Sequence, residues 1–384
     1  MEIKQVYSFV NDALTESIGT SALLQEDLSN VVDVGTSIFD NNAFDAFVRS
    51  LVNHIGRVVF VNRPYRGSAP SVLMDAWEYG SVVEKIHSEM PEAVENESWE
   101  LTDGASYDPN VFHKPKAEAK FFNKLTTFEI DRSITERQVK QSFSDATQLN
   151  AFISMLFNEV EKALTVANDN LIMRTINNMI VETAYNAYSG GAITGAGDTR
   201  AVNLLSRFNT QYSKSLTAAA AIVDPDFIRY AAYIMALYVD RLTRMSTLFN
   251  VGGKQRFTPK DIQHIVMLSE FRAAADVFLQ SSTFHDEYTK LVNAETVPFW
   301  QGSGTGYSFN DTGKVYATSA SGHAQTVTGV IGCIWDRDAL GVMNFNSRVT
   351  TQYNAKAEFT NYFYKRDARY FNDLNENFIV FFVA

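Results

Sequence analysis

Histidine and cysteine are the residues of this sequence best suited to acid–base, metal or nucleophilic chemistry, and their spacing supports none of these. The six histidines are scattered and form no HxxH or HExxH pair, and the single cysteine cannot complete a Cys/His set. A metal site would therefore need three distant segments to converge. We expect neither a metal nor a cofactor. The histidines are His54, His87, His113, His264, His285 and His323.

Candidate catalytic groups are also incomplete. In His285-Asp286-Glu287 the neighbours would point apart on a helix and to opposite faces of a strand, so a solvated turn is favoured. Cys333 lies within an apolar run, which favours an inert core thiol. Asp131 and Glu136 could be imagined as a glycosidase pair, but such pairs arise by chance among 44 acidic residues. The sequence therefore predicts no catalytic residue.

Two glycine-rich strings superficially resemble phosphate-binding loops. The string over residues 302–306, GSGTG, lacks the Lys-Ser/Thr tail of such a loop and does not connect a clean strand to a helix. Gly252-Gly253-Lys254 lacks the upstream glycine and continues into Gln255. A flexible surface loop is the better interpretation of the first string, and neither predicts nucleotide binding.

The composition indicates a folded protein that associates with other chains. Of 384 residues 46% are apolar, enough for substantial cores, and the 28 Phe, 17 Tyr and 4 Trp are of types enriched at subunit interfaces. No run of 18 apolar residues and no signal-peptide pattern occurs, so we expect a soluble protein without membrane contact. A net charge of −11 opposes dedicated DNA binding, which depends on cations that neutralise phosphates.

The pattern of the first 62 residues predicts an N-terminal arm, followed by the first elements of the main folded body. Residues 1–34 carry one short amphipathic helix and a polar, acidic stretch, and form no core alone. Phe44, Phe47, Leu51 and Val52 then recur at helical spacing up to Gly56. The run at 57–61 predicts a strand.

Residues 63–127 predict a long two-stranded loop, because turn formers separate short extended runs there and no amphipathic helix fits. Its first arm is acidic and its returning arm is basic. Facing opposite charges stabilise strand pairing by about 0.2–1 kcal/mol per pair. The hairpin is either solvated or docked on a neighbouring subunit, since an isolated two-stranded hairpin is marginal in water. The predicted contact residues are Glu89, Glu92, Glu95, Glu97, Glu100, Lys114, Lys116, Lys120 and Lys124.

A helix over about 145–188 is the clearest expected element. Apolar residues keep the i, i+3, i+4 rhythm from Leu149 to Ile180, and Ser144 or Asp145 can cap the start. At about 1.5 Å per residue such a helix spans ~60 Å, longer than a compact domain requires, so it must be a spine for other parts. Gly190-Gly191 then ends the element.

The remainder predicts an inserted unit followed by C-terminal strands. Within 196–329 we expect helices at 201–212, from Asp224-Pro225 to about 249 and at 273–280, with strands at 219–223 and 262–268. Strands follow at 330–335, 349–364 and 378–383, with partners expected near 57–62 and 125–134. The body would then be discontinuous, with 196–329 inserted into it.

Several strings, taken in order, resemble the major capsid proteins of tailed bacteriophages with the Hong Kong 97-type fold, in particular the group found in small short-tailed phages. No single string is specific, so the resemblance depends on their order and spacing along the whole chain. They are Val34-Gly35, FVRSLVNHIGR at 47–57, VFHKPK at 111–116, PFWQG at 298–302, and NYFY at 361–364 followed by ARYF at 368–371.

The resemblance implies an α+β capsid fold. Its parts would be an N-terminal arm (1–34), an extended β-hairpin loop (63–127), a peripheral domain (35–62, 128–195 and 330–384, with the spine helix at about 145–188) and an inserted axial α/β domain (196–329). It implies a major capsid protein without enzymatic activity, whose pentamers and hexamers form the icosahedral head around double-stranded DNA, without sequence-specific contact. We identify neither a prohead-protease processing site nor a residue pair for covalent crosslinking.

The resemblance also implies partners and a location. A scaffolding protein, a portal, and decoration or head-fibre proteins would accompany assembly in the host cytoplasm, and the product is the virion. Two other functions remain open from the sequence. One is a tail or tube component, which also assembles, and the other is an α/β enzyme built on 196–329, which would need a cleft with converging titratable groups.

Overall fold

A computed structural model describes most of the chain. The described residues are 3–17, 19, 23–25, 29–40, 43, 46–51, 70–74, 83–91, 93–96, 98, 100–142, 146–190, 195–280, 292–301, 309–318, 322 and 324–384. The strand expected at 57–61, the caps Ser144 and Asp145, and the glycine-rich string at 302–306 lie outside them.

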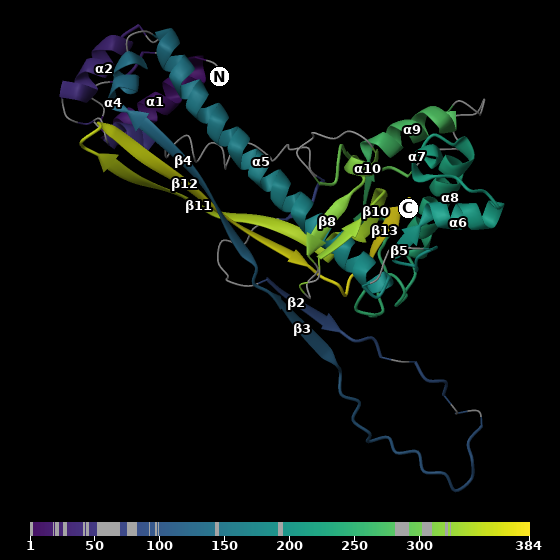
Figure 1. Ribbon diagram of the computed structural model, residues 1–384. Helices are drawn as coiled ribbons and strands as arrows, with labels where there is room; N and C mark the ends of the chain where they lie inside the picture. The colour runs from purple at the N-terminus through teal and green to yellow at the C-terminus, as the bar shows by residue number, and fades with distance from the viewer. Residues whose placement is uncertain are drawn as a thin grey trace.

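A four-stranded sheet of order β1-β11-β12-β4 runs along the molecule (Figure 1). Strands β11 (Leu340–Asn354) and β12 (Phe359–Asn372) form a long antiparallel hairpin, and β4 (Leu125–Thr135) pairs antiparallel with β12. The short β1 (Leu73–Met74) pairs parallel with β11. The partner expected near 125–134 for the C-terminal strands is therefore confirmed for β12, whereas the one near 57–62 lies outside the described residues.

A second sheet has the order β5-β13-β10-β6-β7. Its central strands, β13 (Phe378–Phe382) and β10 (Val330–Asp336), are buried at every residue, which explains their nearly continuous apolar sequences. Strand β10 pairs antiparallel with β13 and with β6 (Gln263–Leu268). The parallel edge strands are β5 (Ala201–Asn203) and β7 (Glu295–Val297).

Short helices and one small hairpin accompany the second sheet. Helix α8 (Pro225–Arg241) begins where Asp224 accepts a hydrogen bond from the amide of Phe227 at 2.9 Å, with proline in the first turn. The other elements are α6 (Leu204–Tyr212), α7 (Ala218–Ala221), η2 (Lys260–Ile262), α9 (Ser269–Gln280), α10 (Phe309–Thr312), β8 (Val315–Thr318), β9 (Ala324–Val327) and η3 (Arg337–Ala339).

Helix α5 (Ala146–Ala187), 42 residues long, joins the two halves of the molecule (Figure 1). Its C-terminal half, with Ile176 and Ile180 fully buried, belongs to the large core around the second sheet. Leu149, Val160 and Leu164 in its N-terminal half belong to a second core. One helix thus contributes to two cores, as a spine must.

The N-terminal residues pack as helices onto the far end of this spine. Helices α1 (Ile3–Ser17) and α2 (Val31–Asp40), with the helical residues 46–51, bury Leu14, Ile38 and Phe47 in the second core. Tyr362 of β12 closes that core from the sheet side. Helix α4 (Glu136–Ser142) lies between β4 and α5 in the chain. The N-terminal segment therefore shares a core with the body, although it forms none alone.

Five sequence predictions differ from the structure. The single strand predicted at 349–364 spans the turn between β11 and β12. The segment predicted as a helix over 201–212 begins as β5, and the predicted strand at 219–223 includes helix α7, capped by Thr217. Helix α8 ends at Arg241 instead of about 249. Strands β10 and β13, predicted in the peripheral body, pair within one sheet with β5, β6 and β7 of the 196–329 unit. The division at residue 330 therefore does not follow the sheets.

Strands β2 (Val83–Ser88) and β3 (Ala117–Phe122), which lie between β1 and β4 in the chain, form a separate antiparallel ribbon. Beyond this ribbon, the described residues between 89 and 116 extend away from both sheets as a long irregular loop (Figure 1). The two-stranded excursion predicted from the turn formers is thus present, although its paired part is confined to the base.

Candidate functional site: the base of the extended loop

The base of the extended loop carries a charged cluster between β2, β3 and the turn that joins β12 to β13. Strand alternation places Lys85 and His87 on the face of β2 that is partly covered, and Ile86 on the opposite face with 69% of its surface exposed. Lys120 of β3 lies directly opposite Lys85. The ribbon therefore presents two ammonium groups and an imidazole to one side.

The turn over residues 373–376 supplies the acidic partners. The amide of Asp373 donates to the carbonyl of Ala339 at 2.7 Å, and Asp373 Oδ1 accepts from the amide of Asn375 at 3.1 Å. From the segment after α8, the amide of Gly252 donates to the carbonyl of Leu374 at 2.8 Å. These bonds fix the turn, so its carboxylates have defined positions before the ribbon contacts them.

Asp373 bonds both opposed lysines. Its side chain is fully buried, with Lys120 Nζ at 2.8 Å from Oδ1 and Lys85 Nζ at 3.0 Å from Oδ2. Burial alone would raise the pKa of the Asp373 carboxyl, but the hydrogen bond from Lys120 and the charge of Lys85 hold it below its usual value. Asp373 is therefore an anion that ties the ribbon to the body.

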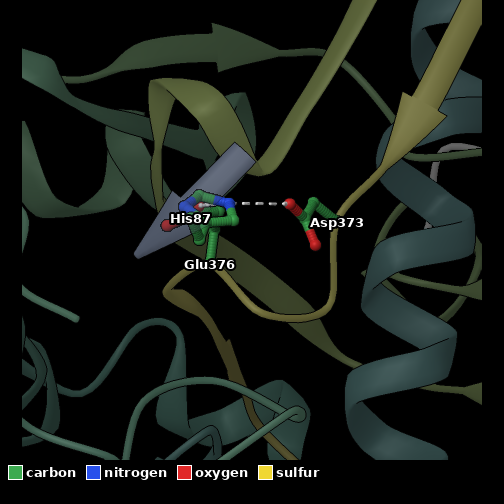
Figure 2. A group of neighbouring side chains, drawn as sticks. All are labelled: His87, Asp373 and Glu376. Carbon is green, nitrogen blue, oxygen red and sulfur yellow. Dashed lines mark ion pairs between the residues drawn. The ribbon is translucent and has the colours of Figure 1, made fainter. Parts of the chain in front are cut away.

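Glu376 lies among three basic groups, and its pKa shifts the other way. His87 Nε2 is 3.3 Å from Oε1, Lys85 Nζ is 3.5 Å from Oε1, and Arg256 Nε is 3.4 Å from Oε2. Burial raises the pKa of the Glu376 carboxyl despite the charges of Lys85 and Arg256. Figure 2 shows the ion pair from His87 across to Asp373, whose Oδ2 is 3.9 Å from Nε2. We call Lys85, His87, Lys120, Arg256, Asp373 and Glu376 the loop-base cluster.

A second set of ion pairs lies beside this cluster. Lys254 Nζ is 2.7 Å from Glu118 Oε1 and 3.6 Å from Glu89 Oε1, and Lys116 Nζ is 4.0 Å from Glu89 Oε2. The hydrogen bond from Lys254 lowers the pKa of Glu118. These side chains are substantially exposed, so each pair adds little stability and mainly favours one orientation of the ribbon.

His87, Asp373 and Glu376 are the group of described residues that could hold a metal ion, because their ligand atoms lie within 4.8 Å of one another. The chemistry of the site argues against a cation, since Lys85 and Arg256 already neutralise the carboxylates at 3.0–3.5 Å. A divalent ion would have to displace both. We assign these carboxylates to ion pairing with the chain's own basic residues.

The structure divides the nine predicted contact residues between the loop base and the loop tip. Lys120 binds Asp373, Lys116 lies near Glu89, and Lys124 lies 5.9 Å from the ring centre of Tyr370, all within the same chain. Glu95, Glu100 and Lys114 are exposed and have no ion pair within the described residues. Glu92 and Glu97 lie outside the described residues.

Sequence reasoning missed Lys85, His87, Arg256, Asp373 and Glu376. They come from three segments separated by more than a hundred residues, so no local motif links them. The remaining signal was the pair of acids three positions apart in Asp-Leu-Asn-Glu, between two strand-like runs.

The other candidate residues have structural roles or lie outside the described residues. Cys333 is buried in β10, and burial raises the pKa of its thiol well above the usual value. His264 stacks on Trp335 with ring centres 6.0 Å apart, and burial lowers the pKa of this histidine. Asp131 lies in β4, whereas Glu136 begins α4 and accepts a hydrogen bond from Tyr353 at 3.0 Å. The string at 285–287 lies outside the described residues.

Apolar side chains are exposed along the extended loop. Val94 is 88% exposed and Phe112 is 82% exposed, which is unusual for side chains of this size in a folded protein. The exposed apolar residues of the ribbon and loop are Ile86, Met90, Val94, Leu101, Tyr107, Val111, Phe112, Phe121 and Leu125.

The model of the Phi29-like phage major capsid protein family matches residues 8–382, nearly the entire chain. The chain belongs to this family. No curated protein matches it. It is accordingly a shell protein of a phage head. The family match establishes this, because the loop and the exposed apolar residues alone do not identify a capsid protein.

Solved phage structures are similar to this chain at low sequence identity. A chain of "Structure of head fiber and inner core protein gp22 of native bacteriophage P68" is 11% identical with a TM-score of 0.50, over 81% of this chain and 83% of that chain. A chain of "Capsid structure of Staphylococcus phage Andhra" is 10% identical with a TM-score of 0.49, over 84% and 86%. The mixed helix-and-sheet fold is that of Hong Kong 97-type capsids, as the sequence resemblance predicted.

Within the described residues, no helix combines the length and the apolar character needed to cross a bilayer.

Proposed function

We propose that copies of this capsid protein form the pentamers and hexamers of the icosahedral head, and that the extended loop of each copy lies on a neighbouring copy. The observation that carries the proposal is the exposed apolar surface of residues 86–125, led by Val94 and Phe112. A single subunit gives these side chains no cover, and burying apolar surface contributes about 25 cal/mol per Å². A second copy of the chain is the partner present at the highest concentration in a growing shell.

The sequence of the loop suggests how a contact of this kind is oriented. The described tip residues Glu95, Glu100 and Asp103 are acidic, whereas Lys114 on the returning arm is basic, and none has an ion pair within the described residues. Charges at the edge of an interface favour one register more than they add affinity. Lys116, Lys120 and Lys124 are used at least partly within their own subunit, so Lys114 is the cleaner probe of contact between subunits.

The 196–329 unit would be the axial domain at the local symmetry axis, and the long sheet with α5 the peripheral domain. Exposed Tyr233 and Val277 on helices of that unit would then face copies of themselves around the axis, through contacts that close into rings. The head would enclose double-stranded DNA without sequence-specific contact, with scaffolding and portal proteins as further partners. The chain would carry out no catalysis, as expected for a structural protein of this family.

The decisive experiment compares shell assembly of two loop-tip variants by electron microscopy and sedimentation. Phe112→Ser should reduce the yield of closed shells several-fold while leaving the circular dichroism and melting of the unassembled chain unchanged. Phe112→Leu keeps the apolar surface and should assemble nearly normally. Normal shell yield from Phe112→Ser combined with Val94→Ser would contradict the proposed loop contact. Tubes or fibres from the wild type would favour a tail component instead.

Lys114 allows the electrostatic part to be tested separately. Lys114→Glu should lower the rate of assembly at low salt and have a smaller effect at high salt, because exposed charges are screened within about 10 Å at 0.1 M salt. Lys114→Gln removes the charge without reversing it and should have an intermediate effect. Shells of normal yield and size from Lys114→Glu at low salt would show that this charge does not guide the contact.

A further inference from the structure

Residues 241–260, from the end of α8 into the segment that follows it, are strongly basic in a chain whose net charge is −11. They include no acidic residue. Lys254 and Arg256 bind acidic groups at the base of the loop, whereas Arg244 is exposed and has no ion pair within the described residues. We call residues 241–260 the basic segment. Its basic residues are Arg241, Arg244, Lys254, Arg256 and Lys260.

Apolar side chains are exposed on the same segment. Ser246 and Arg256 form an antiparallel bridge, and strand alternation places their neighbours Met245 and Phe257 together on one face. These two side chains are 45% and 50% exposed, and Leu248 is 57% exposed. The basic segment therefore offers cationic and apolar contacts side by side.

Hydrogen bonds hold the basic segment in one shape. Asn250 is buried, and its side chain donates to the carbonyl of Lys254 at 2.7 Å and accepts from the amide of Lys254 at 2.8 Å. The carbonyl of Leu248 accepts a hydrogen bond from Thr199 Oγ1 at 2.8 Å. A partner that docks here does not have to order the segment first, which lowers the entropic cost of binding.

The first arm of the extended loop has the complementary composition. Residues 89–108, which we call the acidic segment, include no lysine, arginine or histidine. Their acidic residues are Glu89, Glu92, Glu95, Glu97, Glu100, Asp103 and Asp108. Their exposed apolar side chains include Met90, Val94, Leu101 and Tyr107. The two segments thus match in charge and in apolar character.

The acidic segment meets the basic segment of its own chain at its first residue, where Glu89 Oε1 is 3.6 Å from Lys254 Nζ. Beyond this contact the loop leaves the body (Figure 1), and Glu95, Glu100 and Asp108 are exposed without an ion pair in the described part of the chain. At about 3.3 Å per residue, an out-and-back loop over 89–116 reaches up to ~45 Å, far enough to contact an adjacent copy. These acids are therefore available to another subunit.

We propose that the acidic segment of one copy docks on the basic segment of a neighbouring copy. This inference rests on the proposed function and names the surface that receives the loop. Donor and acceptor are different surfaces of the chain, so the contact is head-to-tail and can repeat around a closed ring. DNA is the less suitable occupant, because phosphates would leave Met245, Leu248 and Phe257 uncovered, whereas the acidic segment brings apolar side chains of its own.

Exchange of charges between the two segments tests the contact, with shell assembly of the full-length chain followed by electron microscopy and sedimentation. The loop variant carries Glu95→Lys and Glu100→Lys, and the acceptor variant carries Arg241→Glu and Arg244→Glu. Each should lower the yield of closed shells several-fold, because like charges then face each other. All four substitutions together should restore most of the yield. An equal mixture of the two variants should assemble better than either alone, because the contact joins different copies.

Lys162→Glu is the matched control, since Lys162 is an exposed base on α5 outside the basic segment. Combined with the loop variant, it should give the yield of the loop variant alone. Rescue by Lys162→Glu would place the loop on the spine helix and overturn the proposal.

The remaining outcomes separate this proposal from the loop contact itself. The acceptor assignment fails if the four combined substitutions assemble no better than the loop variant while Phe112→Ser still lowers the yield, because the loop then docks elsewhere. Normal yield from Phe112→Ser combined with Val94→Ser would contradict the loop contact, and the acceptor with it. If duplex DNA binds the wild type but not the acceptor variant, and charge exchange gives no rescue, the basic segment binds phosphates and the proposal is wrong.

Discussion

Lys85 and Lys120 lie directly opposite each other across β2 and β3, two like charges at one register position of the ribbon. Directly opposed like charges destabilise an isolated pair of strands. Asp373 offsets this repulsion and attaches the ribbon to the body, because its two carboxylate oxygens bond the ammonium groups of Lys85 and Lys120 at 3.0 and 2.8 Å. The paired conformation of β2 and β3 is therefore stable only when the ribbon is docked on its own subunit. The direction of the loop thus depends on the 373–376 turn between β12 and β13.

The first prediction concerns this attachment. Asp373→Asn removes the negative charge that binds both lysines. We expect it to weaken docking of the ribbon by about 1–3 kcal/mol, because the partly buried ammonium groups of Lys85 and Lys120 lose their shared counterion. Limited proteolysis within 83–122 should become several-fold faster, while the melting temperature of the main body changes little.

Asp338→Asn is the matched control. Asp338 is about half exposed and lies 3.8 Å from Arg337, so its neutralisation should leave the proteolysis rate at the wild-type value. Equal rates for Asp373→Asn and the wild type would show that the lysines are accommodated without Asp373.

Sequence periodicity predicted the parts of the fold that repeat a local pattern. The apolar rhythm from Leu149 to Ile180 predicted a helix over 145–188, and α5 spans Ala146–Ala187. The Asp224-Pro225 signal placed the start of α8 correctly. The end of α8 and the assignment of 219–223 failed, because a short apolar run fits a strand or a helix equally well until tertiary contacts decide.

The loop-base cluster could not be predicted, because its geometry depends on strand register. Facing acidic and basic arms predicted opposite charges across the ribbon, and Glu89 with Lys116 fits that pattern. At the base, however, register places lysine opposite lysine, and the counterion comes from residue 373, on the other side of the spine helix in sequence. Nothing in the segment 83–122 encodes that partner.

A second prediction follows from the lowered pKa of Asp373. An acid with a folded-state pKa below its unfolded value contributes stability that is fully present above the unfolded value, about 4, and lost as the pH falls through the lowered folded value. The protection of the β2 and β3 amides from hydrogen–deuterium exchange should therefore decrease below about pH 4. Exchange measurements between pH 5 and pH 3 should show this decrease in the wild type, and Asp373→Asn should show little of it. A decrease of equal size in the variant would assign the acid sensitivity to other carboxyls.

The third prediction tests the role assigned to Cys333. The thiol is buried in β10, and burial raises its pKa, so the reactive thiolate is disfavoured in the folded chain. Iodoacetamide at about pH 8 should modify the native protein at less than about a hundredth of the rate seen in denaturant, as followed by mass spectrometry. Cys333→Ala should fold with a destabilisation of about 1–2 kcal/mol. Rapid alkylation of the native chain would mean that the second sheet opens far more often than its burial predicts.

The last prediction concerns the connection between the spine helix and the second sheet. Gly197 has φ +70°, and a Cβ atom there would lie 1.9 Å from the carbonyl oxygen of Ala201, the first residue of β5. Gly197→Ala should therefore cost about 2–4 kcal/mol, since the backbone must move as well as bear a left-handed alanine. Gly253→Ala is the matched control: its φ is +64° but no atom lies within 4 Å of the new Cβ, so only the conformational cost of about 1 kcal/mol remains. Chemical denaturation of both variants should separate the clash from the strain, and equal losses would show that the edge strand β5 can shift away without cost.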